Sequence, residues 1–126
     1  MKWEYVIVNA RNFISVRGSG NFSTASFEEM IRDIQSDEQW QPSMDCLIDF
    51  SILDLTKTSS NDIKMAAAIH KKYDSQIGRC RIAVVFGREA DFGLGRMYET
   101  FLGSEVLSTV RSFRTADEAR QWLAEE

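Results

Sequence analysis

The sequence has 126 residues, of which 44% are hydrophobic and 27% are charged, so its composition is that of a globular protein and not of a disordered or fibrous chain. Its formal net charge of -4 argues against a nucleic-acid-binding protein that needs a broad basic face. One histidine and two cysteines leave few ligands for a metal site and exclude most forms of histidine-based catalysis.

The length fits a single domain over residues 1–126, because domains usually have ~100–200 residues. No apolar stretch approaches the ~18–20 residues of a membrane span, and the first residues do not have the pattern of a signal peptide. We therefore expect a cytoplasmic protein without stable membrane insertion. Cys46 and Cys80 lie far apart in apolar runs and are expected to be buried free thiols.

The start of the chain predicts an antiparallel β-hairpin. Apolar runs at 3–8 and 13–16 flank the turn-forming segment 9–12, which is the usual arrangement of two short paired strands. The Gly-Ser-Gly-Asn segment at 18–21 is expected to end the second strand.

A helix is predicted next. Ser23 and Ser26 are both candidate N-caps, and Glu29 stands three residues after Ser26, which is the spacing of a capping box. The helix carries one apolar stripe, made of Phe27, Met30, Ile31 and Ile34.

Three further strands then alternate with three helices. The predicted strands cover residues 46–50, 82–86 and 109–113. Each helix carries a stripe of inward-facing positions. In the first of the three it consists of Ile63, Ala66, Ala67, His70 and Tyr73, and in the second of Leu94, Met97, Tyr98, Phe101 and Leu102. In the last helix it consists of Ala119, Trp122 and Leu123. The resulting order ββαβαβαβα predicts an α/β fold with right-handed crossovers and a mixed sheet.

Two glycines in the predicted helix that carries Leu94 and Tyr98, namely Gly93 and Gly95, resemble part of a dinucleotide-binding loop. Such a loop needs a third glycine three residues later, ahead of the helix, where backbone amides meet a pyrophosphate. Tyr98 occupies that position, and both glycines lie within the helical stripe. The pattern therefore favours close packing of the helix against the sheet or a ligand.

Three polar residues carry alternative interpretations. His70, the single histidine, lies on the inner side of an alanine-rich helix, which is typical of a packed or rim histidine more than of a catalytic one. Asp49 and Asp54 bracket a strand end, where a carboxylate pair could perform acid–base chemistry. The position of Asp49 in an apolar run instead favours binding to backbone or hydroxyl donors.

Arg88 and Arg96 could form a small anion site at the start of a helix. Glu89 and Asp91 stand there too and already complement the helix dipole, so a capped and solvated helix start is expected. No catalytic residue, metal-ligand set or cofactor is predicted.

The segment 56–60, Thr-Lys-Thr-Ser-Ser, precedes the second predicted helix. Its hydroxyls are expected to cap free backbone amides of that helix. The same position would stabilise a phosphate on Thr58 or Ser59, because the helix dipole favours added negative charge there.

Several segments of the chain resemble the SpoIIAA-like (STAS/SEC14-like) family of small bacterial proteins. They are Arg81–Phe86, Phe92–Glu99, Val110–Arg114 and Glu118–Leu123. The resemblance implies a four- or five-stranded mixed sheet with helices packed mainly on one face. It also implies one of two functions: binding of a partner kinase under control of serine phosphorylation, or binding of lipids and other apolar molecules between sheet and helices.

In the phosphorylated members of that family, the serine lies in an Asp-Ser-Ser-Gly stretch that opens a helix. Asp49-Phe50-Ser51 resembles the strand end before it, and Thr58 falls closest to the switch position. Lys57 stands where that stretch has aspartate, and Ser60 stands where it has glycine.

Two functions are therefore expected, neither of them enzymatic. The first is a cytoplasmic module that binds a regulatory protein partner through residues 51–60 and 87–92, with Ser51, Thr58, Ser59 and Ser60 as candidate contact or phosphorylation sites. The alternative is a carrier of a small apolar or lipid-like ligand. Its candidate pocket residues, which could equally be ordinary core, are Phe92, Leu94, Met97, Tyr98 and Phe101.

Overall fold

The computed structural model describes residues 1–125, which contain six strands and four α-helices. The strands are β1 (Lys2–Val8), β2 (Phe13–Asn21), β3 (Asp45–Phe50), β4 (Leu53–Asp54), β5 (Arg81–Phe86) and β6 (Thr109–Phe113). The helices are α1 (Thr24–Gln35), α2 (Ser60–Ile77), α3 (Glu89–Leu102) and α4 (Ala116–Ala124). Within residues 1–125, every helix is too short or too polar to cross a membrane. The predicted α/β order is confirmed, and the two-residue β4 is an addition that was not predicted.

The main sheet is mixed, with the strand order β1-β2-β3-β5-β6. β1 and β2 form the predicted antiparallel hairpin, joined by a 3-10 turn at Asn9–Arg11, while the pairs β2–β3, β3–β5 and β5–β6 are all parallel. β4 pairs with the end of β2. Because β2, β3, β5 and β6 all run in the same direction, the loops after β3, β5 and β6 meet at one edge of the sheet.

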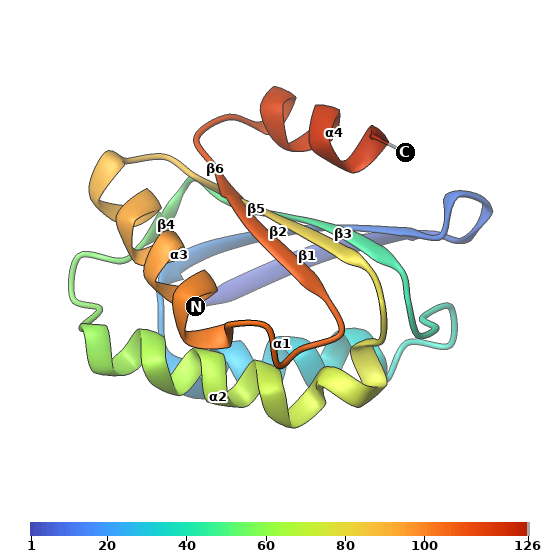
Figure 1. The fold of residues 1–126 in the computed structure, drawn as a ribbon, viewed down its shortest axis with the longest axis horizontal. Helices are drawn as coiled ribbons and strands as arrows, with labels where there is room; N and C mark the ends of the chain where they lie inside the picture. The colour runs from blue at the N-terminus through green and yellow to red at the C-terminus, as the bar shows by residue number, and fades with distance from the viewer. Residues whose placement is uncertain (126) are drawn as a thin grey trace.

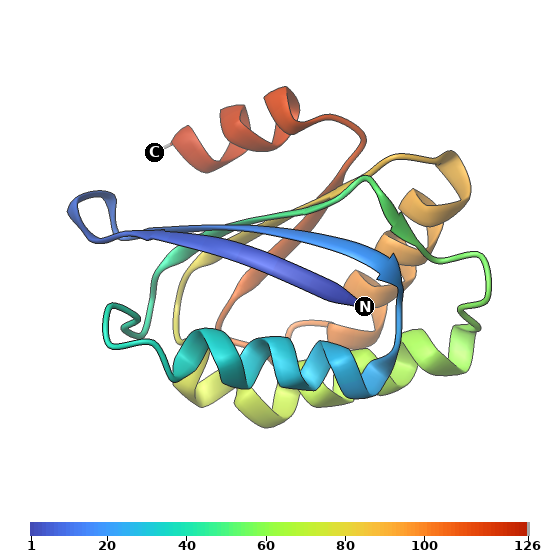
Figure 2. The same cartoon turned by 180° about the vertical axis from the view of Figure 1, so that it is seen from behind.

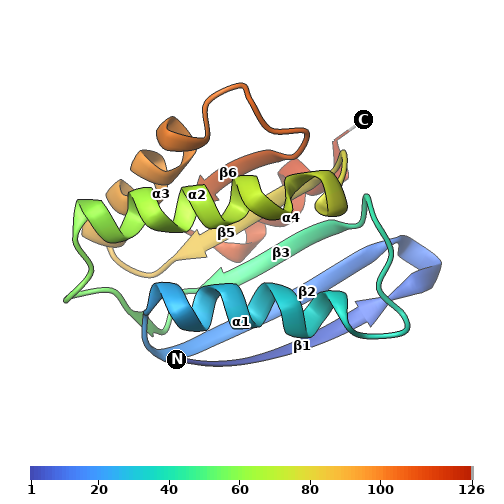
Figure 3. The ribbon, with the colours of Figure 1, turned by 90° about the horizontal axis from the view of Figure 1, so that it is seen from below.

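The helices are divided unequally between the two faces, as the resemblance implied. α1, α2 and α3 lie on one face, whereas α4 alone lies on the other (Figures 1 and 2). Seen from the helical side, α1 lies over the β1–β2 half of the sheet, and α2 and α3 lie toward β5 and β6 (Figure 3). A main core fills the space under the three helices, and a smaller one under α4 contains Leu47, Ala83, Val85, Phe113, Ala119 and Trp122.

The prediction that residues 18–21 end the second strand is wrong. β2 continues to Asn21, and Gly18 pairs with Trp3 of β1. A Cβ atom at Gly18 would lie 2.7 Å from the Phe50 ring, so glycine is needed there for close packing within a strand and not for a turn. β2 is therefore long enough to pair with β4 as well as with β1 and β3.

The N-cap of α1 is Ser23, the first of the two predicted candidates. Its hydroxyl accepts a hydrogen bond from the backbone N–H of Ser26 at 3.1 Å. The capping box predicted between Ser26 and Glu29 is wrong, because Ser26 already lies within the helix. In α4 the N-cap is Thr115, whose hydroxyl accepts a hydrogen bond from the backbone N–H of Glu118.

α3 makes its closest approach to the sheet at Gly95, which is buried. A Cβ atom there would lie 2.5 Å from Ser112 Oγ and 2.8 Å from Phe86 Cζ, distances that real side chains do not tolerate. A Cβ atom at Gly93, in the same helix, would meet no neighbouring atom within 4 Å. The expectation that these glycines allow close packing thus holds for Gly95 alone.

The two glycines give a matched test of this contact. We expect Gly95→Ala to destabilise the protein by ~1–3 kcal/mol, because the methyl group must displace the Phe86 ring or the Ser112 hydroxyl. Gly93→Ala is expected to stabilise it by up to ~1 kcal/mol through helix propensity alone. Urea unfolding of both variants measures the difference, and equal effects would contradict the close approach at Gly95.

Candidate functional site: an apolar cavity between sheet and helices

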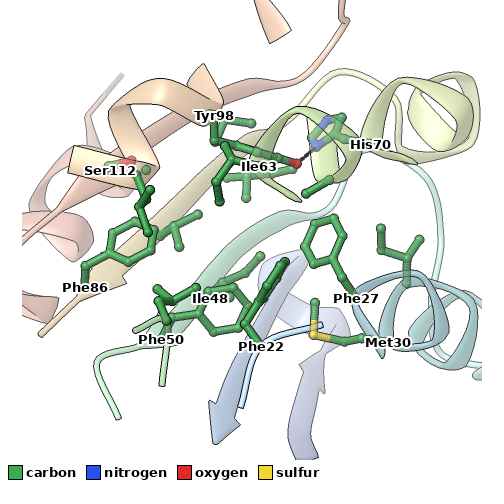
Figure 4. Close-up of a pocket in the computed structure, with 18 of the residues that line it drawn as sticks. Phe22, Phe27, Met30, Ile48, Phe50, Ile63, His70, Phe86, Tyr98 and Ser112 are labelled. Atoms are coloured by element: carbon green, nitrogen blue, oxygen red, sulfur yellow. Dashed lines mark hydrogen bonds between the residues drawn. The ribbon is translucent and has the colours of Figure 1, made fainter. Parts of the chain in front are cut away.

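The main core contains a cavity of about 110 Å³ under α1, α2 and α3. Its surface is almost entirely carbon (Figure 4). Aromatic and aliphatic side chains from the three helices and the sheet contribute most of the lining, which consists of Phe22, Phe27, Met30, Ile31, Ile48, Phe50, Leu55, Ile63, Ala66, His70, Ile77, Ile82, Val84, Phe86, Leu94, Gly95, Tyr98, Val110 and Ser112.

The cavity keeps part of the central sheet from being fully packed. Ile48 lies in β3, in the middle of the sheet, and faces the helical layer, yet it is only partly buried. Val110 of β6, which also lines the cavity, is partly buried in the same way. Helices packed at native density would cover a side chain in the middle of the sheet such as Ile48, so the partial exposure of Ile48 reflects the cavity under this helical layer.

Aromatic rings form one wall of the cavity. The Phe22 and Phe27 rings are 5.9 Å apart at a tilted angle, and the Phe27 and Tyr98 rings meet edge to face at 6.3 Å and 84°. These are the favourable geometries of aromatic pairs. In Figure 4 the three rings lie around the same space, with Met30 beside Phe27.

Behind Tyr98, four side chains form a continuous hydrogen-bonded chain. His70 Nδ1 lies 2.7 Å from the Tyr98 hydroxyl (dashed in Figure 4), and His70 Nε2 lies 2.8 Å from Ser108 Oγ. Ser108 Oγ in turn lies 3.3 Å from a carboxylate oxygen of Asp74. The chain links α3, α2 and the segment before β6.

The direction of the protons in this chain follows from its last member. An ionised Asp74 can only accept, so the Ser108 hydroxyl donates to it and accepts from the His70 Nε2–H. Nδ1 of the neutral imidazole then carries no proton and accepts from the Tyr98 hydroxyl. Asp74 also accepts the backbone N–H of Leu107 at 2.8 Å, which fixes the segment before β6.

Burial keeps both aromatic members of the chain neutral. It lowers the pKa of His70 to about 4, although the nearby Asp74 carboxylate raises it in part. Burial also raises the pKa of the Tyr98 hydroxyl far above its usual range. At neutral pH the wall of the cavity next to these residues therefore carries no charge.

The structure brings Ser108, His70 and Asp74 together, but not as a catalytic triad. In a triad the carboxylate orients the imidazole through the nitrogen opposite the serine. Here Asp74 binds Ser108 itself, and the other imidazole nitrogen is taken by Tyr98. The expectation of a packed histidine fits this arrangement. Ser108 and Asp74 were not singled out from the sequence, because nothing in their local context indicates their common partner.

Of the five pocket residues predicted from the sequence, Leu94 and Tyr98 line the cavity. Phe92 is partly buried against the main core without lining the cavity. Met97 and Phe101 are partly buried on α3 and also lie outside the lining. Only part of the apolar stripe of α3 therefore faces the cavity.

α1 and α2 are joined at the surface by a polar cluster. Glu28 of α1 accepts hydrogen bonds from Lys72 at 2.8 Å and from Tyr73 at 2.7 Å, both on α2. Arg32 donates to the same tyrosine and to Glu28. These bonds from Lys72 and Tyr73 lower the pKa of Glu28 to about 2, so it stays ionised over the whole physiological range.

The hydroxyl residues predicted as partner or phosphorylation sites lie at the sheet edge where the parallel strands end. Ser51 follows β3, and its backbone N–H donates to Asp49 at 2.9 Å. Ser59 is the N-cap of α2 in a complete capping box with Asp62, each backbone N–H being bound by the other side chain. Thr58 is partly buried before this cap, and Ser60 is the exposed first residue of the helix.

The other polar candidates Asp49, Asp54 and Arg88 each make their own local hydrogen bonds. Asp54 binds the backbone N–H and hydroxyl of Thr56, and Asp49 binds the Ser51 N–H, so the two carboxylates each stabilise a separate turn. Arg88 makes a bidentate ion pair with the buried Asp91 at 2.7 and 3.0 Å.

Within residues 1–125, no group of three or more metal-ligating side chains is found. Cys46 and Cys80 are both free thiols as predicted, but only Cys46 is buried, whereas Cys80 is partly buried. Burial raises the pKa of both thiols, that of Cys80 to about 12.

The fold is similar to that of a solved structure. An uncharacterised protein of the DUF3478 family with a SpoIIAA-like fold, from Shewanella loihica PV-4, superposes with a TM-score of 0.57 and 18% identity, covering 89% of this chain and 84% of that chain. The predicted resemblance to SpoIIAA-like proteins is therefore confirmed at the level of the fold. No protein-family model and no curated protein matches the sequence.

The buried histidine predicts a loss of stability in mild acid. Unfolded His70 takes up a proton near pH 6.5 and folded His70 only near pH 4, so the unfolded state binds more protons between these values. The contribution of His70 is fully present above pH 6.5 and decreases by about 3 kcal/mol as pH falls to about 4. His70→Gln lacks this titration. The pH dependence of the difference in unfolding free energy between the two proteins measures it, and a constant difference would contradict a neutral buried imidazole.

The capping box at the start of α2 predicts different roles for two adjacent serines. Ser59→Ala is expected to cost ~0.5–2 kcal/mol of stability, because the backbone N–H of Asp62 loses its acceptor. Ser60→Ala, one residue later and exposed, is expected to change stability little. Thermal unfolding of both variants distinguishes them, and a larger loss for Ser60→Ala would refute the assignment of the cap.

Proposed function

We propose that the protein is a non-enzymatic binding protein that holds a small apolar molecule in the cavity between the sheet and helices α1 to α3. The observation that carries this proposal is the cavity itself, which has an almost purely carbon surface in the middle of the main core. An empty cavity of this kind costs stability, because its lining loses contacts with neighbouring atoms. A bound apolar molecule would restore those contacts.

The volume supports a small ligand. An engineered cavity of roughly 150 Å³ with aliphatic and aromatic walls stays dry and binds benzene. The present cavity, of about 110 Å³, has similar walls and is of comparable size. A molecule the size of one ring, or a short hydrocarbon segment, is therefore the scale of ligand that it suits.

The surrounding polar groups support binding without catalysis. His70, Ser108 and Asp74 are committed to one another, and Tyr98 donates its proton to His70. A catalytic base or nucleophile must reach the reacting atom of its substrate. These four side chains hold α2 and α3 in place beside the cavity.

A second candidate function is contact with a regulatory protein through the edge where the parallel strands end. Ile52, in the 51–60 segment, is a large apolar residue with 55% of its surface exposed. Exposed apolar side chains surrounded by polar residues are typical of contact surfaces. A cytoplasmic location and a phosphorylation switch near Thr58 or Ser59 remain predictions of this second hypothesis.

Ala66 offers a direct test of the cavity, because it is buried on α2 and lines it. We expect benzene to raise the melting temperature of the wild-type protein, since a ligand that binds only the folded state stabilises it by mass action. Ala66→Leu fills the space and is expected to abolish this increase. Ala68→Leu makes the same change on the exposed side of the same helix and is expected to keep it.

An organic extract of each purified protein, analysed by gas chromatography and mass spectrometry, complements the melting experiment. A molecule retained by the wild type and Ala68→Leu but not by Ala66→Leu would identify the natural ligand. Binding of benzene unaffected by Ala66→Leu, or a wild-type protein that retains nothing and does not respond to benzene, would count against the proposed function.

A further inference from the structure

We propose that the cavity selects an uncharged, compact hydrocarbon-like molecule of about the size of one aromatic ring, and rejects ligands with an acidic head group such as fatty acids. This inference rests on the proposed function and specifies its ligand class. Three features carry it: the absence of charged side chains from the lining, the near absence of exposed polar surface, and the arrangement of the aromatic wall.

The first feature is the absence of a counter-charge. Among residues 1–125, no lysine, arginine, aspartate or glutamate lines the cavity. A carboxylate that left water for this surface would lose its hydration without gaining an ion pair, which is prohibitively costly. Arg32 and Lys72, on the helical surface, are already bound to Glu28 outside the cavity.

His70 is the one lining residue that could become a cation. To pair with a carboxylate, it would have to bind a proton in a buried position and release the Tyr98 hydroxyl from Nδ1. Both changes oppose binding, because the histidine is only 4% exposed and its other nitrogen is held by Ser108. The lining therefore stays neutral when a ligand enters.

The second feature is that the polar side chains lining the cavity expose almost no polar surface to it, and that two of them, His70 and Tyr98, are bound to each other. The Tyr98 proton is donated to His70, and both imidazole nitrogens are occupied. A ligand hydroxyl inside the cavity would meet a surface that is almost entirely carbon and would remain without a partner. Selection thus extends to neutral molecules: a plain ring is preferred to the same ring with a hydroxyl group.

The third feature is the aromatic wall. Phe22, Phe27 and Tyr98 already meet in tilted and edge-to-face geometries around the space. A further flat ring can join this cluster with the same favourable geometry, whereas a saturated chain gains only general contact. The small volume also excludes a long acyl chain without displacement of a helix.

The proposal is tested on the wild-type protein with four probes: toluene, phenol, benzoate and decanoate. Isoleucine methyl groups report on the site by NMR, because Ile48 and Ile63 line the cavity and Ile52 is an exposed control. At pH 7 we expect toluene to shift the Ile48 and Ile63 signals, to bind at least tenfold more tightly than phenol, and to leave Ile52 unchanged. Benzoate and decanoate are expected to cause no saturable shift of the cavity signals.

Tyr98→Phe provides an independent readout. It removes the hydroxyl that donates to His70 Nδ1 and leaves that nitrogen as a free acceptor beside the cavity. Phenol can then donate its own proton to Nδ1, so the ratio of toluene to phenol affinity is expected to fall at least fivefold relative to wild type. Comparing ratios within each protein removes the different solubility of the two probes.

The outcomes separate this inference from the proposed function. If toluene binds at Ile48 and Ile63 but benzoate or decanoate binds as tightly, the selectivity is overturned and the binding function stands. If phenol binds wild type as tightly as toluene does, the claim about the occupied polar groups is overturned. If none of the four probes perturbs the cavity signals, the proposed function fails. Should Tyr98→Phe not fold, the four-probe comparison on the wild type still decides the proposal.

Discussion

The close approach of α3 to the sheet at Gly95 is the contact on which the rest of the helical face depends. Because glycine has no side chain, the helix axis can come near the Phe86 ring and the Ser112 hydroxyl. Tyr98 follows one turn later, at a height that lets its hydroxyl reach His70 on the neighbouring helix. A bulkier residue at position 95 would lift α3 and separate this pair.

The same contact explains why a cavity remains beside a well-packed core. α3 is held close to β5 and β6 at Gly95, while the polar cluster around Glu28 joins α1 to α2 at the surface. Ile48, on the sheet between these regions, is only partly covered. The helical layer is thus fixed at both sides and leaves space in the middle.

Polar and apolar groups are separated sharply around this space. Tyr98, His70, Ser108 and Asp74 satisfy one another in a single chain, which avoids the cost of leaving a buried donor or acceptor unpaired. As a result their hydrogen-bonding groups are not offered to the cavity. The protein therefore combines a neutral hydrocarbon surface with a hydrogen-bonded polar support behind it, as the proposed binding function requires.

The sequence by itself determined the order and class of the elements, because apolar periodicity is a local property of each segment. It also pointed to Leu94 and Tyr98 through the stripe on α3, and to Gly95 through its position within that stripe. The prediction that the strand ends at Gly18 was wrong, because a glycine needed for packing against Phe50 cannot be told in the sequence from a glycine needed for a turn. Only the tertiary structure decided that Ser108 and Asp74 join His70, and that part of the α3 stripe faces an open space. Both depend on how far apart the helices lie from each other and from the sheet, a distance set jointly by side chains from segments that are remote in sequence.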